Sequence, residues 1–160
     1  MKTRIVWFLA ILISVIVLDQ WLKIQVLEGF RWESRAVSIV LVYNDGVAFS
    51  MFAFLQGWLK WIQIALLAGL GLYLTLANGA FRQYWLGFGF ILGGGIGNVI
   101  DRFVYGKVVD YVYWHYWFEF AIFNFADVCI DIGVGILIIS WLWHERNTHR
   151  AKHKAAQNRF

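Results

Sequence analysis

The chain contains no proline, a single cysteine and few charged residues. Only 15% of its 160 residues are charged, whereas about a quarter would be charged in a typical soluble domain. The absence of proline excludes proline kinks, and the lone Cys129 excludes an internal disulfide framework. Apolar residues are in excess: 61% of the residues are hydrophobic, and the mean hydropathy is +0.61. This balance indicates a membrane protein.

The basic residues are unevenly distributed along the chain. The formal net charge of +4 would suggest nucleic-acid binding if the charge were spread over a folded surface. Most of it follows the last apolar run instead, where a short basic tail is a topology signal and a contact for anionic lipids. We therefore expect membrane lipids as partners and no nucleic acid. The tail carries Arg146, Arg150, Lys152, Lys154 and Arg159.

Four segments are long and apolar enough to cross a bilayer, which takes roughly 20 mostly apolar residues. They cover residues 5–27, 58–77, 84–104 and 125–143. The first begins after Lys2 and Arg4, but no small-residue cleavage site follows it, so we interpret it as a retained helix. The sequence thus predicts an integral membrane protein, mainly α-helical with four transmembrane helices. Residues 1–160 would form one membrane-embedded domain, ending in a basic cytoplasmic tail over residues 144–160.

Both termini are expected in the cytoplasm, because the basic tail and the turn over residues 78–84 mark that side. With this orientation, nearly all ionisable residues near the membrane gather at the opposite, outer face. They are Asp19, Lys23, Asp101, Arg102 and Asp127 in or beside the spans, and Asp110 in an outer loop. The sequence therefore predicts a polar site at the outer boundary of the hydrocarbon.

The outer segment over residues 28–57 is not a span. It contains a β-rich run over residues 37–43, and the turn Asn44-Asp45-Gly46 follows that run directly. We expect a small β-cradle there, lying on the membrane surface, with an interfacial loop or helix.

Two aspartates, Asp110 and Asp127, each lie in a short polar motif where an apolar segment meets water. An ionisable group at a membrane helix is costly and is interpreted first as functional. Two carboxyl groups that share a proton can activate water for hydrolysis. Asp131 lies one helical turn after Asp127, and could be a second member of the pair, a proton relay, or a partner of Lys23 or Arg102.

Asp19 and Lys23 are spaced i, i+4 and are interpreted as a structural ion pair. The glycine-rich run over residues 93–97 has no phosphate-binding signature and favours close helix packing. The four histidines form no set with metal-ligand spacing, so no metal or other cofactor is expected.

A non-enzymatic membrane protein, with a proton-relay or transport role for Asp19, Lys23 and Asp127, is the alternative interpretation. A transporter is expected to show internal repeats and broken helices near the midplane. The sequence shows no repeat, and its acids collect at one face rather than along a path.

The ordered motifs make the chain similar to signal peptidase II, the bacterial lipoprotein signal peptidase. The resemblance covers nearly the whole chain. It implies that Asp110 and Asp127 are the catalytic pair, and that Asn44, Gly46, Asn98, Asp101, Arg102 and Asn124 support the site or bind substrate. The motifs are Asp19-x-x-x-Lys23, Asn44-x-Gly46 running into Ala48-Phe49, Asn98-x-x-Asp101-Arg102, Val108-Val109-Asp110, and Phe123-Asn124-x-Ala126-Asp127.

The resemblance also implies an activity and a location. The expected enzyme is an aspartic endopeptidase of the bacterial inner membrane, with its site at the periplasmic face and no cofactor. It would cut diacylglyceryl-modified prolipoproteins just before the lipidated cysteine. We further expect a monomer that is blocked by the cyclic peptide antibiotic globomycin, as members of the family are.

Overall fold

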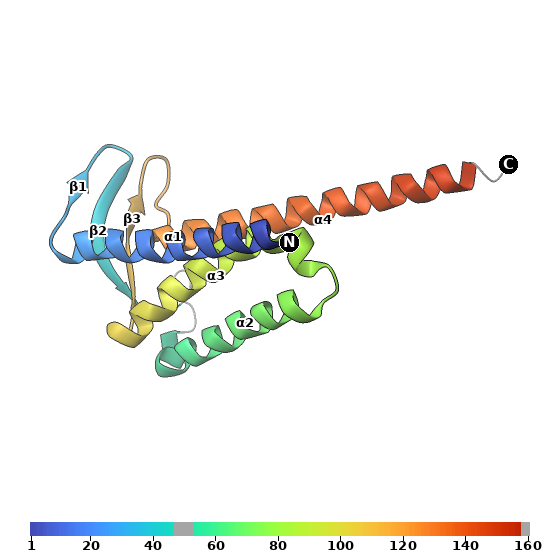
Figure 1. Ribbon diagram of the computed structural model, residues 1–160. Coiled ribbons are helices and arrows are strands. Elements are labelled where there is room, and N and C mark those ends of the chain that lie inside the picture. The colour runs from blue at the N-terminus through green and yellow to red at the C-terminus, as the bar shows by residue number, and fades with distance from the viewer. Residues whose placement is uncertain (47–52, 158–160) are drawn as a thin grey trace.

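A computed structural model describes residues 1–46 and 53–157 (Figure 1). Its long helices are α1 (Lys2–Leu27), α2 (Gln56–Leu76), α3 (Ala80–Val104) and α4 (Phe125–Gln157), with a short 3₁₀ helix η2 (Ala53–Leu55) before α2. Its strands are β1 (Trp32–Glu33), β2 (Val37–Asn44) and β3 (Val108–Trp114). Ala48 and Phe49 lie outside the described residues.

Within the described residues, α1, α2 and α4 are long and apolar enough to cross a membrane. The fourth expected span corresponds to α3, which does not reach that criterion because glycines and polar residues dilute its apolar character. Most of the glycines and polar residues of α3 are buried inside the bundle. The other three helices expose large apolar side chains along their length, such as Trp7 and Leu18 on α1 and Trp58 on α2.

Helix α3 lies at the centre of the bundle and packs against α1, α2 and α4 (Figure 1). The glycines of α3 permit this close packing. A Cβ on Gly94 would lie 2.4 Å from the carbonyl oxygen of Ala126 on α4, and one on Gly97 would lie 2.5 Å from Asp19 Oδ2 on α1. The small-residue run therefore brings backbones together, as the sequence indicated.

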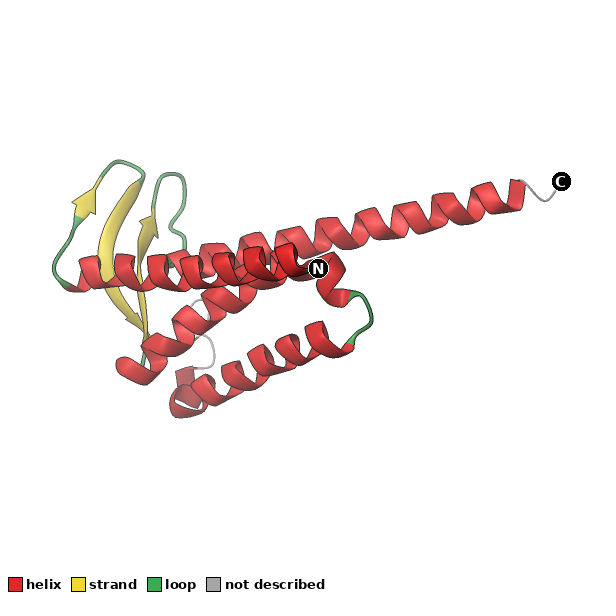
Figure 2. Cartoon of the chain, viewed as in Figure 1, coloured by secondary structure: helices red, strands yellow, loops and turns green. Residues whose placement is uncertain are grey.

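A three-stranded antiparallel sheet, in the order β1-β2-β3, closes the end of the bundle at which α1 ends and α4 begins (Figure 2). Strand β2 matches the predicted β-rich run. Strand β3 was not predicted: Asp110 was expected in a loop, but it lies within β3, paired with Val42. The pairing of β2 with β3 shifts register between Ile39 and Val42.

Helix α4 is longer than the expected span over residues 125–143, since it continues without a break to Gln157. The segment expected as a basic tail is therefore largely helical. Its composition explains this, because Ala, Lys, Arg, Glu and Gln are all good helix formers.

Candidate active site

Asp110 is held between two asparagine amides. The side chain is 2% exposed, and Val109 before it is fully buried against the bundle. Asn44, at the end of β2, donates from Nδ2 to Asp110 Oδ2 at 2.9 Å, and Asn124 donates from Nδ2 to Asp110 Oδ1 at 2.7 Å. Both carboxyl oxygens of Asp110 therefore accept hydrogen bonds from neutral donors.

Asp127 is held by the start of its own helix. Asn124 is the residue before α4, and its Oδ1 accepts from the Asp127 backbone N–H at 3.0 Å. Asp127 Oδ2 in turn accepts from the Asn124 backbone N–H at 3.1 Å. This reciprocal pair is a capping box, so the residue that caps α4 also fixes Asp127 and contacts Asp110.

The other free N–H groups at the start of α4 are satisfied by side chains from elsewhere. The Ala126 N–H donates to Asp19 Oδ1 at 3.0 Å, and the Phe125 N–H donates to the Tyr111 hydroxyl at 3.2 Å. A helix leaves its first N–H groups without partners inside the helix. Here α1 and β3 supply the partners and so fix the depth and direction of α4.

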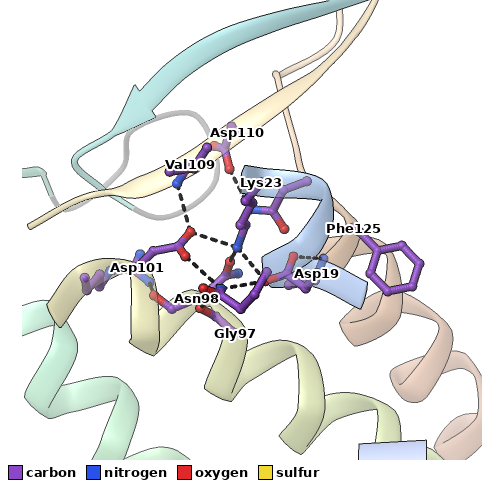
Figure 3. Close-up of polar contacts among 12 residues, drawn as sticks. Asp19, Lys23, Gly97, Asn98, Asp101, Val109, Asp110 and Phe125 are labelled. Carbon is purple, nitrogen blue, oxygen red and sulfur yellow. Dashed lines mark hydrogen bonds and ion pairs between the residues drawn. The ribbon is translucent and has the colours of Figure 1, made fainter. Parts of the chain in front are cut away.

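Lys23 is the buried centre of the supporting network (Figure 3). Its ammonium group donates to Asp19 Oδ2 at 2.7 Å and Asn98 Oδ1 at 3.0 Å, and pairs with Asp101 Oδ2 at 2.8 Å. Lys23 is 1% exposed, and the two acids are fully buried. The expected pair of Asp19 and Lys23 is thus found together, within a three-residue ion cluster that includes Asp101.

Asp101 ties α3 to the sheet. Its Oδ2 accepts from the Val109 backbone N–H at 3.0 Å, and its Oδ1 accepts from Gln20 Nε2 at 3.0 Å. Because Val109 precedes Asp110, this bond positions the strand that carries one of the two aspartates.

The orientation of each asparagine amide is set by a group that can only donate. Gly46 N–H faces Asn44 Oδ1 at 2.9 Å, the Lys23 ammonium faces Asn98 Oδ1, and the Asp127 N–H faces Asn124 Oδ1. Each amide must therefore turn its NH₂ group toward an aspartate. Asn98 completes the set by donating from Nδ2 to Asp127 Oδ1 at 2.8 Å. All three amides thus present donors to the aspartate pair.

Arg102 closes the site on the side of α2. Its guanidinium donates to the Gly46 carbonyl at 2.7 Å, to Gln63 Oε1 at 2.7 Å and to the Asn98 carbonyl at 3.4 Å. Among the described residues, no carboxylate forms an ion pair with Arg102. The position of Arg102 beside Asp110 and Asp127 is therefore fixed by carbonyl groups.

The pKa of Asp110 is raised to about 6, chiefly by burial and also by the negative charge of Asp127, while the amides of Asn44 and Asn124 act in the opposite direction. A carboxyl group with this pKa is partly protonated near neutral pH. Such a group can therefore both hold and release a proton during a reaction.

Both aspartates line one cavity of about 440 Å³. Polar residues, among them Asn44, Gly46, Asn98 and Arg102, meet at its sheet end. The remainder is lined mainly by apolar side chains of α2, such as Leu59, Ile62 and Leu66, by the loop over residues 120–123, and by Ile130 of α4. The expected site residues are thus brought together around a space that is polar at one end and apolar along the helices. Asp101 does not line the cavity, and its carboxylate pairs with Lys23.

The comparisons with known proteins agree with this arrangement. The family model described as signal peptidase (SPase) II matches residues 11–143. The chain belongs to the signal peptidase II family. Membership of a peptidase family argues against the non-enzymatic interpretation considered for the sequence.

Curated relatives of this signal peptidase II family member cover nearly the full chain. A lipoprotein signal peptidase of Helicobacter pylori is 46% identical over 151 residues, covering 94% of this chain and 96% of the relative. A lipoprotein signal peptidase of Wolinella succinogenes is 53% identical over 130 residues, covering 81% and 89%.

Solved structures also resemble it. A bacterial membrane enzyme determined by the in meso method at 2.3 Å resolution superposes with a TM-score of 0.77 at 26% identity, covering 88% of this chain and 90% of the other. Together with the apolar helices, this likeness identifies a multi-pass membrane protein of the signal peptidase II family.

Three contributors to the site were not predicted: Gln20, Gln63 and Tyr111. Gln20 and Gln63 are isolated amides in otherwise apolar helices, and a polar group in such a helix is a signal that could have identified them. Tyr111 follows Asp110 in β3 and carries no comparable signal, since an aromatic residue is common in any strand.

Proposed function

We propose that this chain is an aspartic endopeptidase that removes the signal peptide from diacylglyceryl-modified prolipoproteins, cutting before the lipidated cysteine. Asp110 and Asp127 would be the catalytic pair. The observation that carries the proposal is that both aspartates line the same cavity while Asn124 contacts each of them.

In the proposed reaction, one carboxylate takes a proton from water as the water oxygen attacks the carbonyl carbon of the scissile peptide bond. The other carboxyl group, protonated, donates its proton to the carbonyl oxygen as negative charge develops there. Collapse of the tetrahedral intermediate breaks the C–N bond, and a proton passes to the departing amine. The products are a signal peptide with a new carboxylate and a lipoprotein with a new amino terminus.

The supporting residues suit this chemistry. The three asparagine amides hold both aspartates in place without adding positive charge that would favour two fully ionised carboxylates. Burial of Asp110 favours the protonated form. A pair with such surroundings would keep one proton near neutral pH, which is what acid–base catalysis of hydrolysis requires.

The cavity suits a substrate that remains in the membrane. Its apolar wall is formed by α2 and the loop over residues 120–123, together with Ile130 of α4. A signal-peptide helix could therefore lie along this wall while its end reaches the polar part. We place α3 as a fourth span, both termini in the cytoplasm and the site at the periplasmic face of the inner membrane, in a monomer.

The test is cleavage of a diacylglyceryl-modified precursor by the purified protein. Asp110→Asn and Asp127→Asn should each reduce turnover by at least about 10²-fold, because an amide keeps the shape of a carboxyl group but cannot transfer its proton. Glu33→Gln, an exposed change on β1, is the matched control and should keep turnover near that of the unmodified protein.

Two outcomes separate the parts of the proposal. Near-normal turnover by either aspartate variant would show that the catalytic pair is wrongly assigned. Failure of the unmodified protein to cleave the lipidated precursor would contradict the substrate class itself.

A further inference from the structure

Asp131 has no role in the network described above. It lies on α4 one turn after Asp127, lines the same cavity and is exposed to it. Among the described residues, none forms a hydrogen bond or ion pair with its carboxylate. Neither Lys23 nor Arg102, which the sequence offered as partners, is paired with it, because both bind other groups.

The surroundings of Asp131 make this carboxylate costly. It belongs to a segment of α4 that is apolar enough to span a membrane. The cavity that Asp131 lines also has apolar side chains, including Leu66 of α2 and Ile130 of α4. A carboxylate in a membrane-spanning segment is expensive unless a donor meets it, so a donor group on a molecule that fills the cavity would be a favourable partner.

We infer that Asp131 is a specificity-determining residue that accepts a hydrogen bond from a hydroxyl- or amino-bearing side chain of the bound signal peptide. The inference rests on the proposed function. At Asp131, the enzyme would distinguish a polar side chain of the substrate from an apolar side chain of the same shape.

The helix geometry predicts which substrate residue is recognised. Four residues of α-helix advance about 6 Å, so Asp131 lies about that far from Asp127 along the helix axis. An extended peptide covers that distance in about two residues, and a helical peptide in about four. The recognised side chain is therefore the second to fourth residue on the amino side of the cleaved bond, the side that remains in the membrane.

Asp131 lies beside the aspartate pair but takes no part in its hydrogen bonds. Asp127 both caps α4 and contacts Asn98 and Asn124, whereas no described residue links Asp131 to Asp110. A role in substrate recognition uses the position of Asp131 in the cavity without requiring it to act on the reacting atoms.

The experiment uses lipidated precursors that differ only in Thr or Val at one of these three positions. The two side chains have nearly the same shape, and only Thr can donate. The unmodified protein should prefer Thr by about tenfold in kcat/KM at one position, mainly through KM, which is the size expected for a hydrogen bond to a charged group. Asp131→Leu should abolish or reverse this preference, and Asp131→Asn, which can accept but is neutral, should reduce it.

Ile132→Asn is the matched control, because Ile132 is the exposed neighbour on α4 and does not line the cavity. This variant should keep the preference for Thr. A Thr-to-Val ratio near one in the unmodified protein, or the same ratio in Asp131→Leu, would overturn the inference alone. Failure of the unmodified protein to cleave any of the precursors would overturn the proposed function together with it.

Discussion

Four carboxyl groups and two cations share the polar centre of this molecule. The acids are Asp19, Asp101, Asp110 and Asp127, and the cations are Lys23 and Arg102. Full ionisation of these six side chains would leave two negative charges without a partner in a largely buried region. Lys23 is shared by Asp19 and Asp101, and Arg102 lies beside Asp110 and Asp127, so each pair of acids would carry one of the two excess charges. A single proton held between Asp110 and Asp127 would remove the excess charge of that pair.

The raised pKa of Asp110 predicts how stability depends on pH. A carboxyl group that ionises near pH 6 when folded and near 3.8 when unfolded favours the folded state at low pH. That contribution, about 3 kcal/mol at most, is lost as pH rises through 6. The thermal unfolding midpoint should therefore fall more between pH 4.5 and 8 for the unmodified protein than for Asp110→Asn, which has no charge to gain. Parallel pH dependence of the two proteins would contradict the assigned shift.

Asp19→Ala should lower the amount of folded protein more than it alters the chemical step. The change removes a buried partner of Lys23 and the acceptor of the Ala126 N–H, with an expected loss of about 3 kcal/mol in the free energy of unfolding. Asp45→Ala is the control, because it removes one member of the exposed pair with Lys107 and should change stability by less than about 1 kcal/mol. A stable Asp19→Ala protein defective only in turnover would mean that Asp19 acts on the substrate.

At the scale of elements, the site is built where three chain segments meet. Strand β2 ends at Asn44, β3 carries Asp110, and α4 begins after Asn124. The asparagine followed three residues later by an aspartate is a capping-box pattern. That pattern agrees with the predicted start of the fourth span at residue 125, and it could also have predicted the contact between Asn124 and Asp127.

The close contact of α3 and α4 is the element-scale feature on which the position of Asp127 depends. A Cβ at position 94 would meet the Ala126 carbonyl oxygen at 2.4 Å, and backbone cannot move aside as a flexible side chain can. Gly94→Ala should therefore separate the helices, lower the unfolding midpoint and reduce cleavage at least tenfold, a size of about 1.4 kcal/mol in the barrier.

Gly135→Ala is the control for this packing prediction, since a Cβ there meets nothing within 4 Å. In a helix this change should leave stability equal or slightly higher, because alanine has the better helix propensity. Similar behaviour of the two alanine variants, in both stability and cleavage, would show that the contact between α3 and α4 is not limiting.

For the whole molecule, the sequence predicted what depends on local pattern. Long apolar runs located the helices to within a few residues at most ends, and the motif order resembling signal peptidase II brought Asp110, Asp127 and the asparagines into one predicted site. The sequence did not predict β3, because its partner β2 lies more than 60 residues earlier and such pairing leaves no local signature. The sequence predicted the pair of Asp19 and Lys23, which are spaced i, i+4 along one helix. It did not predict that Asp101 of another helix completes this buried cluster.

The arrangement of the whole molecule predicts that an unlipidated precursor is a poor substrate. Asp110 lies on β3 and Asp127 at the start of α4, and these elements meet at the end of the bundle that the sheet closes (Figure 1). Phe54 in η2 and Trp58 near the start of α2 are exposed. Two acyl chains on the substrate cysteine would hold it firmly in the bilayer, whereas a single chain binds membranes only marginally. They would also fix the depth of the scissile bond relative to Asp110 and Asp127, so that lipid contributes orientation as well as affinity.

The measurement compares kcat/KM for matched precursors with and without diacylglycerol in the same bilayer, with an expected loss of about 10²-fold or more. Equal rates would mean that the enzyme recognises the peptide sequence alone.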